Sequence, residues 1–189
     1  MSLAQECAAG EYGTKESWPD VYVQPGESHL VRAPTILRTV LGSCVGVTFW
    51  NRRLGIGGLC HPMLPAYPAH KAQLSLAASR RYVDFTVRDL AAQLDALGAT
   101  RRETEVKLFG GADVLLVADR ATRPTVGQLN GEAALRVLAS EGFAIAASSL
   151  GGLAGLHIDF YTETGEVLLR RLNATGVLHR GGRGRRDGA

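Results

Sequence analysis

The chain has 189 residues, of which 46% are hydrophobic and 21% charged, and its formal net charge is +3. These proportions are ordinary for a soluble globular protein, and the length suits one domain with its own hydrophobic core. No run reaches the roughly 18 apolar residues of a membrane span, and no apolar signal segment opens the chain, so the sequence predicts a cytoplasmic protein without membrane insertion.

The positive charge is concentrated at the C-terminus. Residues 179–189 contain four arginines and one aspartate, and the rest of the chain is nearly neutral. A Gly/Arg-rich end of this kind is more often solvated than a nucleic-acid site. We therefore expect no nucleic-acid partner, and we divide the chain into a flexible leader (1–19), a folded domain (20–173) and a disordered tail (174–189).

Strand patterns dominate the first third of the domain. Val45, Val47 and Phe49 alternate with Gly46 and Thr48, a spacing that places one apolar row on one face of a strand. Similar runs rich in β-branched residues, each bounded by turn residues, predict the neighbouring strands. The expected strands cover residues 21–23, 29–32, 35–40, 45–49 and 54–61.

Two helices are expected in the rest of the chain. The first covers 77–97, because its apolar residues recur at spacings of four and three: Val83, Val87, Leu90, Leu94 and Leu97. Gly98 follows it at the position where glycine commonly ends a helix. The second helix covers 128–140, with Leu135 and Leu138 on its buried face.

Four further strands are predicted at 106–109, 143–147, 158–161 and 167–172, the last two joined as a hairpin. Two helices among roughly eight strands predict an α/β fold. We expect a single-domain sandwich with a mixed, mainly antiparallel sheet flanked by two main helices.

One predicted hairpin brings a thiol near an imidazole. A turn centred between Arg52 and Arg53 would place Cys44 directly opposite His61 on the same sheet face. Opposite side chains have Cβ atoms about 4.5–5.5 Å apart, which is close to hydrogen-bonding range. A one-residue slip would instead pair Cys44 with Cys60.

This pairing favours nucleophilic chemistry at Cys44. A free thiol has a pKa near 8.5, so an imidazole that accepts its proton is needed to form the thiolate at neutral pH. Gly42 and Ser43 allow a tight turn whose N–H groups would stabilise an oxyanion. Glycines in the facing strand (Gly55, Gly57 and Gly58) would leave room for a substrate backbone.

Two other interpretations stay open at this point. A cysteine beside a strand is often a small buried hydrophobe, and a histidine before proline is often a strand-end residue. A metal or redox site built from Cys44, Cys60 and His61 is also conceivable. Adjacent residues of a strand point to opposite faces, however, so Cys60 and His61 are poorly placed to share a tetrahedral ion.

Three motifs resemble those of a known family. They are TVLGSC at 39–44, GGLCHPMLP at 57–65 and KLFGGA at 107–112. In this order, within a similarity that covers residues 21–172, they resemble the chemoreceptor glutamine deamidases of the CheD family.

The resemblance implies a catalytic Cys44, His61 and Thr39 in a fold similar to that of deamidating bacterial toxins. It implies a hydrolase that converts glutamines of methyl-accepting chemotaxis receptors to glutamate with release of ammonia, without metal or cofactor. Some members also hydrolyse receptor glutamyl methyl esters, and some bind a phosphatase of the CheC type. The alternative is a non-catalytic regulator that binds such a phosphatase or the receptor.

Overall fold

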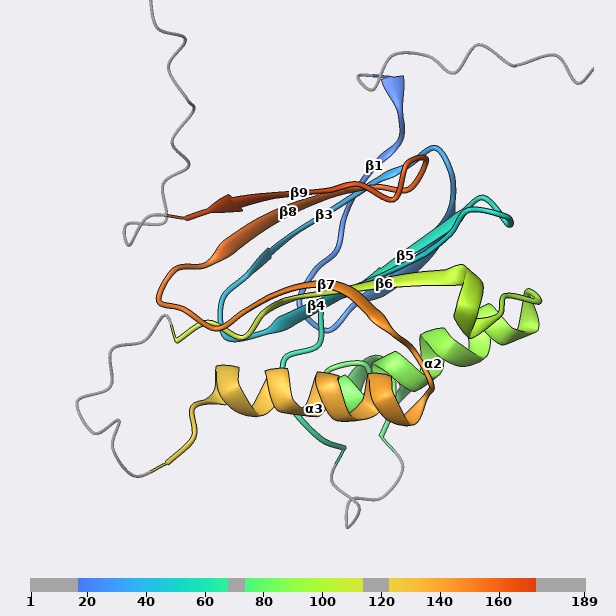
Figure 1. The fold of residues 1–189 in the computed structure, drawn as a ribbon. Coiled ribbons are helices and arrows are strands. Elements are labelled where there is room, and N and C mark those ends of the chain that lie inside the picture. Colours follow the sequence, from blue (N-terminus) through green and yellow to red (C-terminus); the bar gives the residue numbers. More distant parts are fainter. Residues whose placement is uncertain (1–16, 68–73, 114–122, 173–189) are drawn as a thin grey trace, which may run out of the picture.

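Two β-sheets and a pair of helices form three layers in the computed structural model, which describes residues 17–67, 74–113 and 123–172 (Figure 1). The four-stranded sheet has the order β1 (Asp20–Tyr22), β3 (Ile36–Leu41), β8 (Leu156–Tyr161) and β9 (Val167–Arg171). The five-stranded sheet has the order β2 (Ser28–Arg32), β5 (Ile56–Cys60), β4 (Val45–Asn51), β6 (Thr104–Gly110) and β7 (Ile145–Leu150). The helical elements are α1 (Leu76–Ser79), α2 (Val83–Ala96), the 3₁₀ turn η2 (Arg101–Glu103) and α3 (Val126–Ser140).

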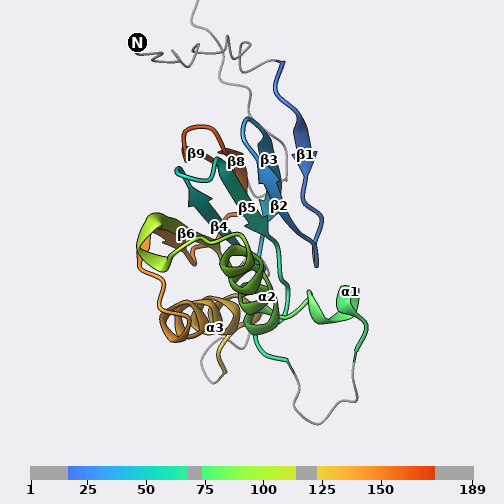
Figure 2. The same ribbon diagram turned by 90° about the vertical axis from the view of Figure 1, so that its right-hand side faces the viewer.

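The predicted α/β sandwich is confirmed, with one refinement. Among the described strands only β1–β3 and β6–β7 pair in parallel, so the arrangement is mixed and mainly antiparallel, as expected. The strands divide between two sheets, however, instead of forming one. Helices α2 and α3 both cover the same face of the five-stranded sheet, and the four-stranded sheet covers the other face (Figures 1 and 2).

The central strands β4 and β5 are buried on both faces, which explains their composition. Val45, Val47 and Phe49 pack in the core beneath the helices, whereas Trp50 packs in the layer between the two sheets. The alternation predicted for β4 therefore separates two cores rather than a core from solvent. Side chains of odd and even number in this strand belong to different layers.

The helix predicted at 77–97 is interrupted. It forms as α1 and α2 because the carbonyl oxygen of Arg81, in the break between them, accepts hydrogen bonds from the N–H groups of Met63 and Leu64, at 2.8 and 2.9 Å. This long-range backbone contact could not be inferred from helical periodicity. The predicted helix end is confirmed, since Gly98 adopts a φ of 75° just beyond α2.

Helix α3 begins two residues earlier than predicted. Thr125 caps it in a reciprocal capping box with Gln128, which supplies partners for N–H groups left free at a helix start. Leu138 is fully buried as expected, but the prediction for Leu135 is wrong, since this residue is 43% exposed. The buried residues Asn130 and Ala134 mark the face of the helix that packs against the core, and Leu135 lies next to this face rather than on it.

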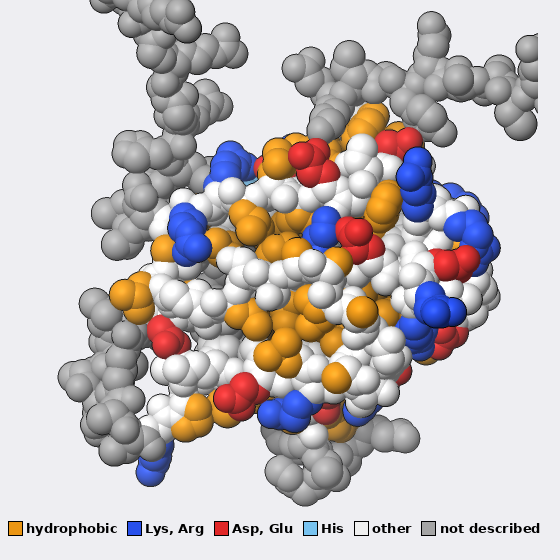
Figure 3. Space-filling view, viewed as in Figure 1, with side chains coloured by type: hydrophobic (Ala, Val, Ile, Leu, Met, Phe, Trp, Pro, Cys, Tyr) orange, Lys and Arg blue, Asp and Glu red, His pale blue; other side chains and the backbone are white. Residues whose placement is uncertain are grey.

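The face seen in Figure 1 carries one edge strand of each sheet, β9 and β7. Figure 3 shows apolar side chains gathered on this face among polar ones. Leu168 and Leu169 of β9 are 43% and 41% exposed. Among the described residues, no helix is long and apolar enough to cross a membrane. The predicted leader, apart from residues 17–19, and the predicted tail lie outside the described residues.

The glycines of β5 serve packing between layers, and our expectation that they leave room for a substrate is wrong. β5 lies between β2 and β4, so its backbone is not open. A Cβ on Gly57 would lie 2.5 Å from Cγ2 of Thr162, in the turn that follows β8 of the opposing sheet. A Cβ on Gly58 would lie 3.1 Å from Cδ1 of Leu30. The absent side chains let the two sheets and the edge strand approach closely.

We predict that Gly57→Ala lowers the free energy of unfolding by about 1–3 kcal/mol, through overpacking. Thr162 cannot move aside easily, because its hydroxyl bonds both the N–H and the carbonyl of Thr35. Urea denaturation would measure the loss. The matched control is Gly131→Ala, whose new Cβ lies 3.7 Å from Leu150 and which should gain up to about 1 kcal/mol from helix propensity. Equal stabilities of the two variants would contradict this account.

Candidate active site

The hairpin of β4 and β5 has a different register from the one predicted. Asn51 pairs with Ile56, and Val47 pairs with Cys60, so the connection is a four-residue loop. Gly55 supplies the left-handed residue that this loop needs, with a φ of 59°, and the Asn51 side chain accepts a hydrogen bond from the N–H of Leu54. The predicted direct pairing of Cys44 with His61 is therefore wrong.

The observed register still places Cys44 and His61 on the same side. Continued past Cys60, it sets His61 opposite Gly46, and the N–H of Val45 indeed donates to the carbonyl of Pro62 at 3.3 Å. Cys44 is then a diagonal neighbour of His61, and residues in such pairs lie about 7–8 Å apart, with their Cβ atoms somewhat closer. A shift by two residues changes the partner but not the sheet face.

Both residues belong to the layer between the two sheets. Cys44 packs, half-buried, against the inter-sheet cluster of Leu41, Phe109, Leu156 and Ile158. His61 is only 2% exposed. Cys60, one residue before it, packs instead in the core beneath the helices. Cys60 and His61 thus point to opposite faces, which rules out their sharing a metal ion with Cys44.

Thr39 holds the imidazole of His61 from the opposing sheet. Thr39 lies on β3, is fully buried, and its Oγ1 is 2.7 Å from Nδ1 of His61. The same hydroxyl donates to the carbonyl of Val23 at 2.8 Å. A hydroxyl has one hydrogen, so Oγ1 accepts from His61, and the imidazole proton sits on Nδ1. This leaves Nε2 of His61 with a lone pair, as a general base requires.

Burial keeps both reactive groups neutral. Desolvation raises the pKa of the Cys44 thiol above its usual value, and its own backbone N–H opposes this only in part. Desolvation lowers the pKa of His61 to about 4, more than the nearby Val23 carbonyl raises it. Both shifts disfavour a preformed thiolate–imidazolium pair. Among the described residues, no hydrogen bond joins the Cys44 thiol to the His61 ring.

The turn before Cys44 contains backbone N–H groups that make no hydrogen bond with a described residue. The N–H groups of Gly42 and Ser43, our predicted oxyanion donors, form no hydrogen bond with a described residue. Both residues are partly exposed. The carbonyls of the same turn are occupied: that of Gly42 accepts from Ala112 at 2.9 Å, and that of Cys44 accepts from Gly111 at 2.7 Å.

Gly110 and Gly111 form a close support for this turn. Both have positive φ angles, of 99° and 63°. A Cβ on Gly110 would lie 2.3 Å from the carbonyl oxygen of Cys44, so only glycine allows this approach. The two glycines of the KLFGGA motif thus have a structural role, which is to support the cysteine turn.

Asn130 is a residue near the site to which the sequence analysis gave no role. It is fully buried in α3, and its Nδ2 donates to the carbonyls of Ser43 and Met63, both at 2.9 Å. An asparagine in the interior of a helix is unfavourable by propensity. This unfavourable helix propensity was the feature of the sequence that could have indicated a tertiary role for position 130.

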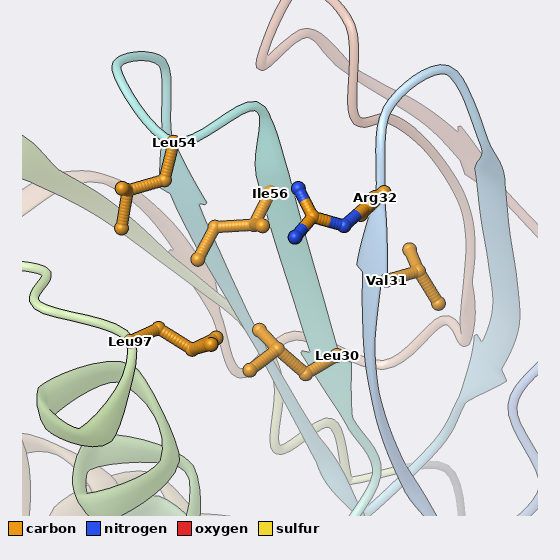
Figure 4. A pocket seen from close by; sticks show the side chains of 6 residues that line it. All are labelled: Leu30, Val31, Arg32, Leu54, Ile56 and Leu97. Atoms are coloured by element: carbon orange, nitrogen blue, oxygen red, sulfur yellow. The ribbon is translucent and has the colours of Figure 1, made fainter.

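A separate apolar hollow lies away from this site, between β2, β5 and the end of α2 (Figure 4). Side chains of Leu30, Ile56 and Leu97 converge on it, whereas Val31 points away, into the inter-sheet layer. None of the residues that line it belongs to the Cys44–His61 site.

Comparison with known proteins identifies the family. The model of the CheD family, described as "CheD chemotactic sensory transduction", matches residues 63–171. A protein of Geobacter sulfurreducens named "Probable chemoreceptor glutamine deamidase CheD 2" is 43% identical over 157 residues, covering 83% of this chain and 92% of that protein. The chain belongs to the CheD family.

One further relative agrees with the CheD family, and one solved structure is only weakly similar to this chain. A "Probable chemoreceptor glutamine deamidase CheD" of Ralstonia nicotianae is 37% identical, over 93% of this chain and 74% of its own length. Among solved structures, the Bacillus licheniformis hypothetical protein YfiH has a TM-score of 0.43 at 11% identity, over 65% of this chain and 50% of that one. That likeness is too low to carry an argument.

The CheD family assignment extends to the candidate site. The family model begins at Met63, after Cys44 and His61. The Geobacter relative, however, matches 83% of a 189-residue chain. A match of that extent has to include the central segment with Thr39, Cys44 and His61.

We predict that acid destabilises the protein through His61. An unfolded histidine has a pKa near 6.5, whereas burial holds that of His61 at about 4. Between these values the unfolded state binds more protons, so falling pH favours unfolding, by up to about 3 kcal/mol for the whole shift.

Urea denaturation at pH 7.5 and pH 4.5 would test this with the wild type and His61→Gln. The variant keeps a side-chain donor for Thr39 but does not titrate in this range. We expect the wild type to lose more stability between the two pH values. An equal loss in both proteins would exclude His61 as the source.

Proposed function

We propose that this chain deamidates glutamine side chains of methyl-accepting chemotaxis receptors, with Cys44 as nucleophile, His61 as base and Thr39 as the residue that orients the base. The observation that carries the proposal is the 2.7 Å contact between Thr39 and Nδ1 of His61, which leaves Nε2 free beside the layer that holds Cys44. The substrate class follows from the names of the relatives.

Acylation begins from the neutral pair. When the carboxamide of a receptor glutamine enters, Nε2 of His61 takes the thiol proton as Sγ of Cys44 attacks the carboxamide carbon. Proton transfer coupled to attack fits two groups whose burial disfavours their charged forms. The free N–H groups of Gly42 and Ser43 would stabilise the oxyanion of the tetrahedral intermediate. The C–N bond then breaks, and the proton on His61 leaves with the nitrogen as ammonia.

Hydrolysis reverses these roles for water. Nε2 of His61 accepts a proton from a water molecule, which attacks the thioester carbon. The C–S bond breaks, Cys44 regains its proton, and the receptor keeps a glutamate. The sum is one glutamine and one water converted to one glutamate and one ammonia, with no redox change. The reaction as written needs no metal or cofactor.

The finer expectations from the sequence and from the resemblance remain predictions. They are hydrolysis of receptor glutamyl methyl esters, binding of a CheC-type phosphatase and a cytoplasmic location. The alternative function is a non-catalytic regulator that binds this phosphatase or the receptor. The two functions differ in whether receptor glutamine is converted.

We predict that Cys44→Ala lowers deamidation by at least about a thousandfold, because the nucleophile is removed. The assay is ammonia release from a recombinant chemoreceptor of the same bacterium, with mass spectrometry of its glutamines. The matched control is Cys60→Ala: burial raises the pKa of that thiol to about 12, and it faces the other core. Full activity of the Cys44→Ala protein would refute the mechanism, and an inactive wild type would favour the regulator.

We predict that Thr39→Val lowers kcat about tenfold to a hundredfold with little change in KM. Valine keeps the shape but removes the acceptor for Nδ1 of His61, so the ring loses its fixed orientation and tautomer. Thr39→Ser keeps the hydroxyl and should restore most of the rate. If valine and serine behave alike, the hydroxyl does not orient the base.

A further inference from the structure

Asn130 links the two segments that carry the proposed nucleophile and base. Ser43, whose carbonyl accepts one hydrogen bond from Nδ2, directly precedes Cys44. Met63, whose carbonyl accepts the other, lies two residues after His61. An amide nitrogen has two hydrogens, and both are used here. Apart from the β4–β5 ladder and the Val45–Pro62 bond, this side chain is the cross-link that the described structure provides between the two segments.

The orientation of the Asn130 amide that allows these two hydrogen bonds leaves its oxygen without a partner among the described residues. Oδ1 of Asn130 is buried and, in the described part of the chain, has no hydrogen-bond partner. A buried acceptor without a donor is destabilising, and native proteins rarely keep one without a reason. Turning the amide over would set Oδ1 against two carbonyl oxygens. The residue therefore forgoes one bond in order to make the two that join Ser43 and Met63.

Helix α3 holds the side-chain amide of Asn130 in a fixed position. Its first turn is held by the capping box of Thr125 and Gln128. Gly127 lies against the loop that supports the cysteine turn, since a Cβ there would be 2.4 Å from the carbonyl oxygen of Gly111. Gly111 in turn donates to the carbonyl of Cys44. The helix thus supports the cysteine turn in two ways, directly through the Asn130 side chain and indirectly through the contact of Gly127 with Gly111.

We infer that Asn130 is a positioning residue for the proposed deamidation: it sets the spacing of Cys44 and His61 by binding the backbone on both sides. This inference rests on the proposed function. Asn130 does not touch the reacting atoms, because it is fully buried and both its donors are committed. Its loss should slow the chemical step and leave substrate affinity nearly unchanged.

The first test is the kinetics of Asn130→Asp. The carboxylate keeps the shape, has no N–H to donate and repels the two carbonyls. We expect kcat to fall tenfold to a hundredfold and KM to change less than threefold. Asn130→Ser removes the donors without adding a charge and should show the same pattern, so it replaces the aspartate variant if that protein does not fold. An unchanged kcat in either folded variant would overturn the inference.

The matched control is Asn51→Asp. Asn51 is also fully buried, and its Nδ2 donates to Oγ1 of Thr104 at 3.3 Å, at the other end of β4. Thermal denaturation should show a loss of stability in both aspartate variants. Only the change at Asn130 should lower kcat. A similar loss of kcat at Asn51 would mean that general destabilisation, not positioning, explains the effect.

The second test does not depend on the substrate. Alkylation of Cys44 by iodoacetamide, followed at the peptide level by mass spectrometry, reports assistance by His61 even if no receptor is deamidated. We expect Asn130→Asp to slow alkylation at least fivefold in the wild-type background and less than twofold in the His61→Ala background. Equal factors in the two backgrounds would overturn the inference. Failure of receptor deamidation with the expected coupling intact would instead overturn the proposed function alone.

Discussion

The hydrogen bond between Thr39 and His61 is the contact on which the candidate site depends, and it crosses from one sheet to the other. Thr39 belongs to β3 of the four-stranded sheet, and His61 directly follows β5 of the five-stranded sheet. Neither sheet alone holds a base with a defined tautomer. The geometry of the site therefore depends on the close packing of the two sheets. Gly57, which lets Thr162 in the turn after β8 approach β5, contributes to this packing although it is not one of the proposed catalytic residues.

Burial in this layer also decides the charge state of the site. A thiolate and an imidazolium would both have to be desolvated between apolar side chains such as Leu41 and Ile158. Desolvation raises the pKa of Cys44 and lowers that of His61, so the resting pair is neutral. In the proposed mechanism, the nucleophile is generated only when a substrate carbonyl is present to be attacked. Such a site leaves little thiolate exposed to unwanted oxidation between turnovers, because the thiolate is the reactive form.

Local patterns in the sequence predicted the elements well, and long-range contacts account for most of the errors. Alternation located β4, and glycine located the end of α2. The turn between β4 and β5 was misjudged, because a four-residue loop with Gly55 in the left-handed region replaced the expected tight turn. Cys44 and His61 nevertheless stayed on one face, since the error was an even number of residues. The predicted placement of Cys44 and His61 on one sheet face is therefore confirmed although the predicted register is wrong.

Local patterns could show at most that Asn130 is an unfavourable residue inside a helix; they showed neither its hydrogen-bond partners nor the division into two sheets. Asn130 is separated from its acceptors by 87 and 67 residues. Nothing in the periodicity of α3 distinguishes a buried amide from an exposed one. Likewise, strands that alternate apolar and polar residues look the same in one sheet or two. The resemblance to a family could place Thr39 beside His61, but only the packing shows that the contact joins separate sheets.

The same burial favours a threonine over an aspartate as the proposed orienting residue. Thr39 is completely enclosed, and a carboxylate at its position would place a charge in a buried environment, which is costly. A hydroxyl satisfies the Val23 carbonyl and Nδ1 of His61 together and carries no charge. It fixes the tautomer but stabilises the imidazolium less than an anion would. A base of this kind suits a reaction in which the proton is held only briefly, between the thiol and the departing ammonia.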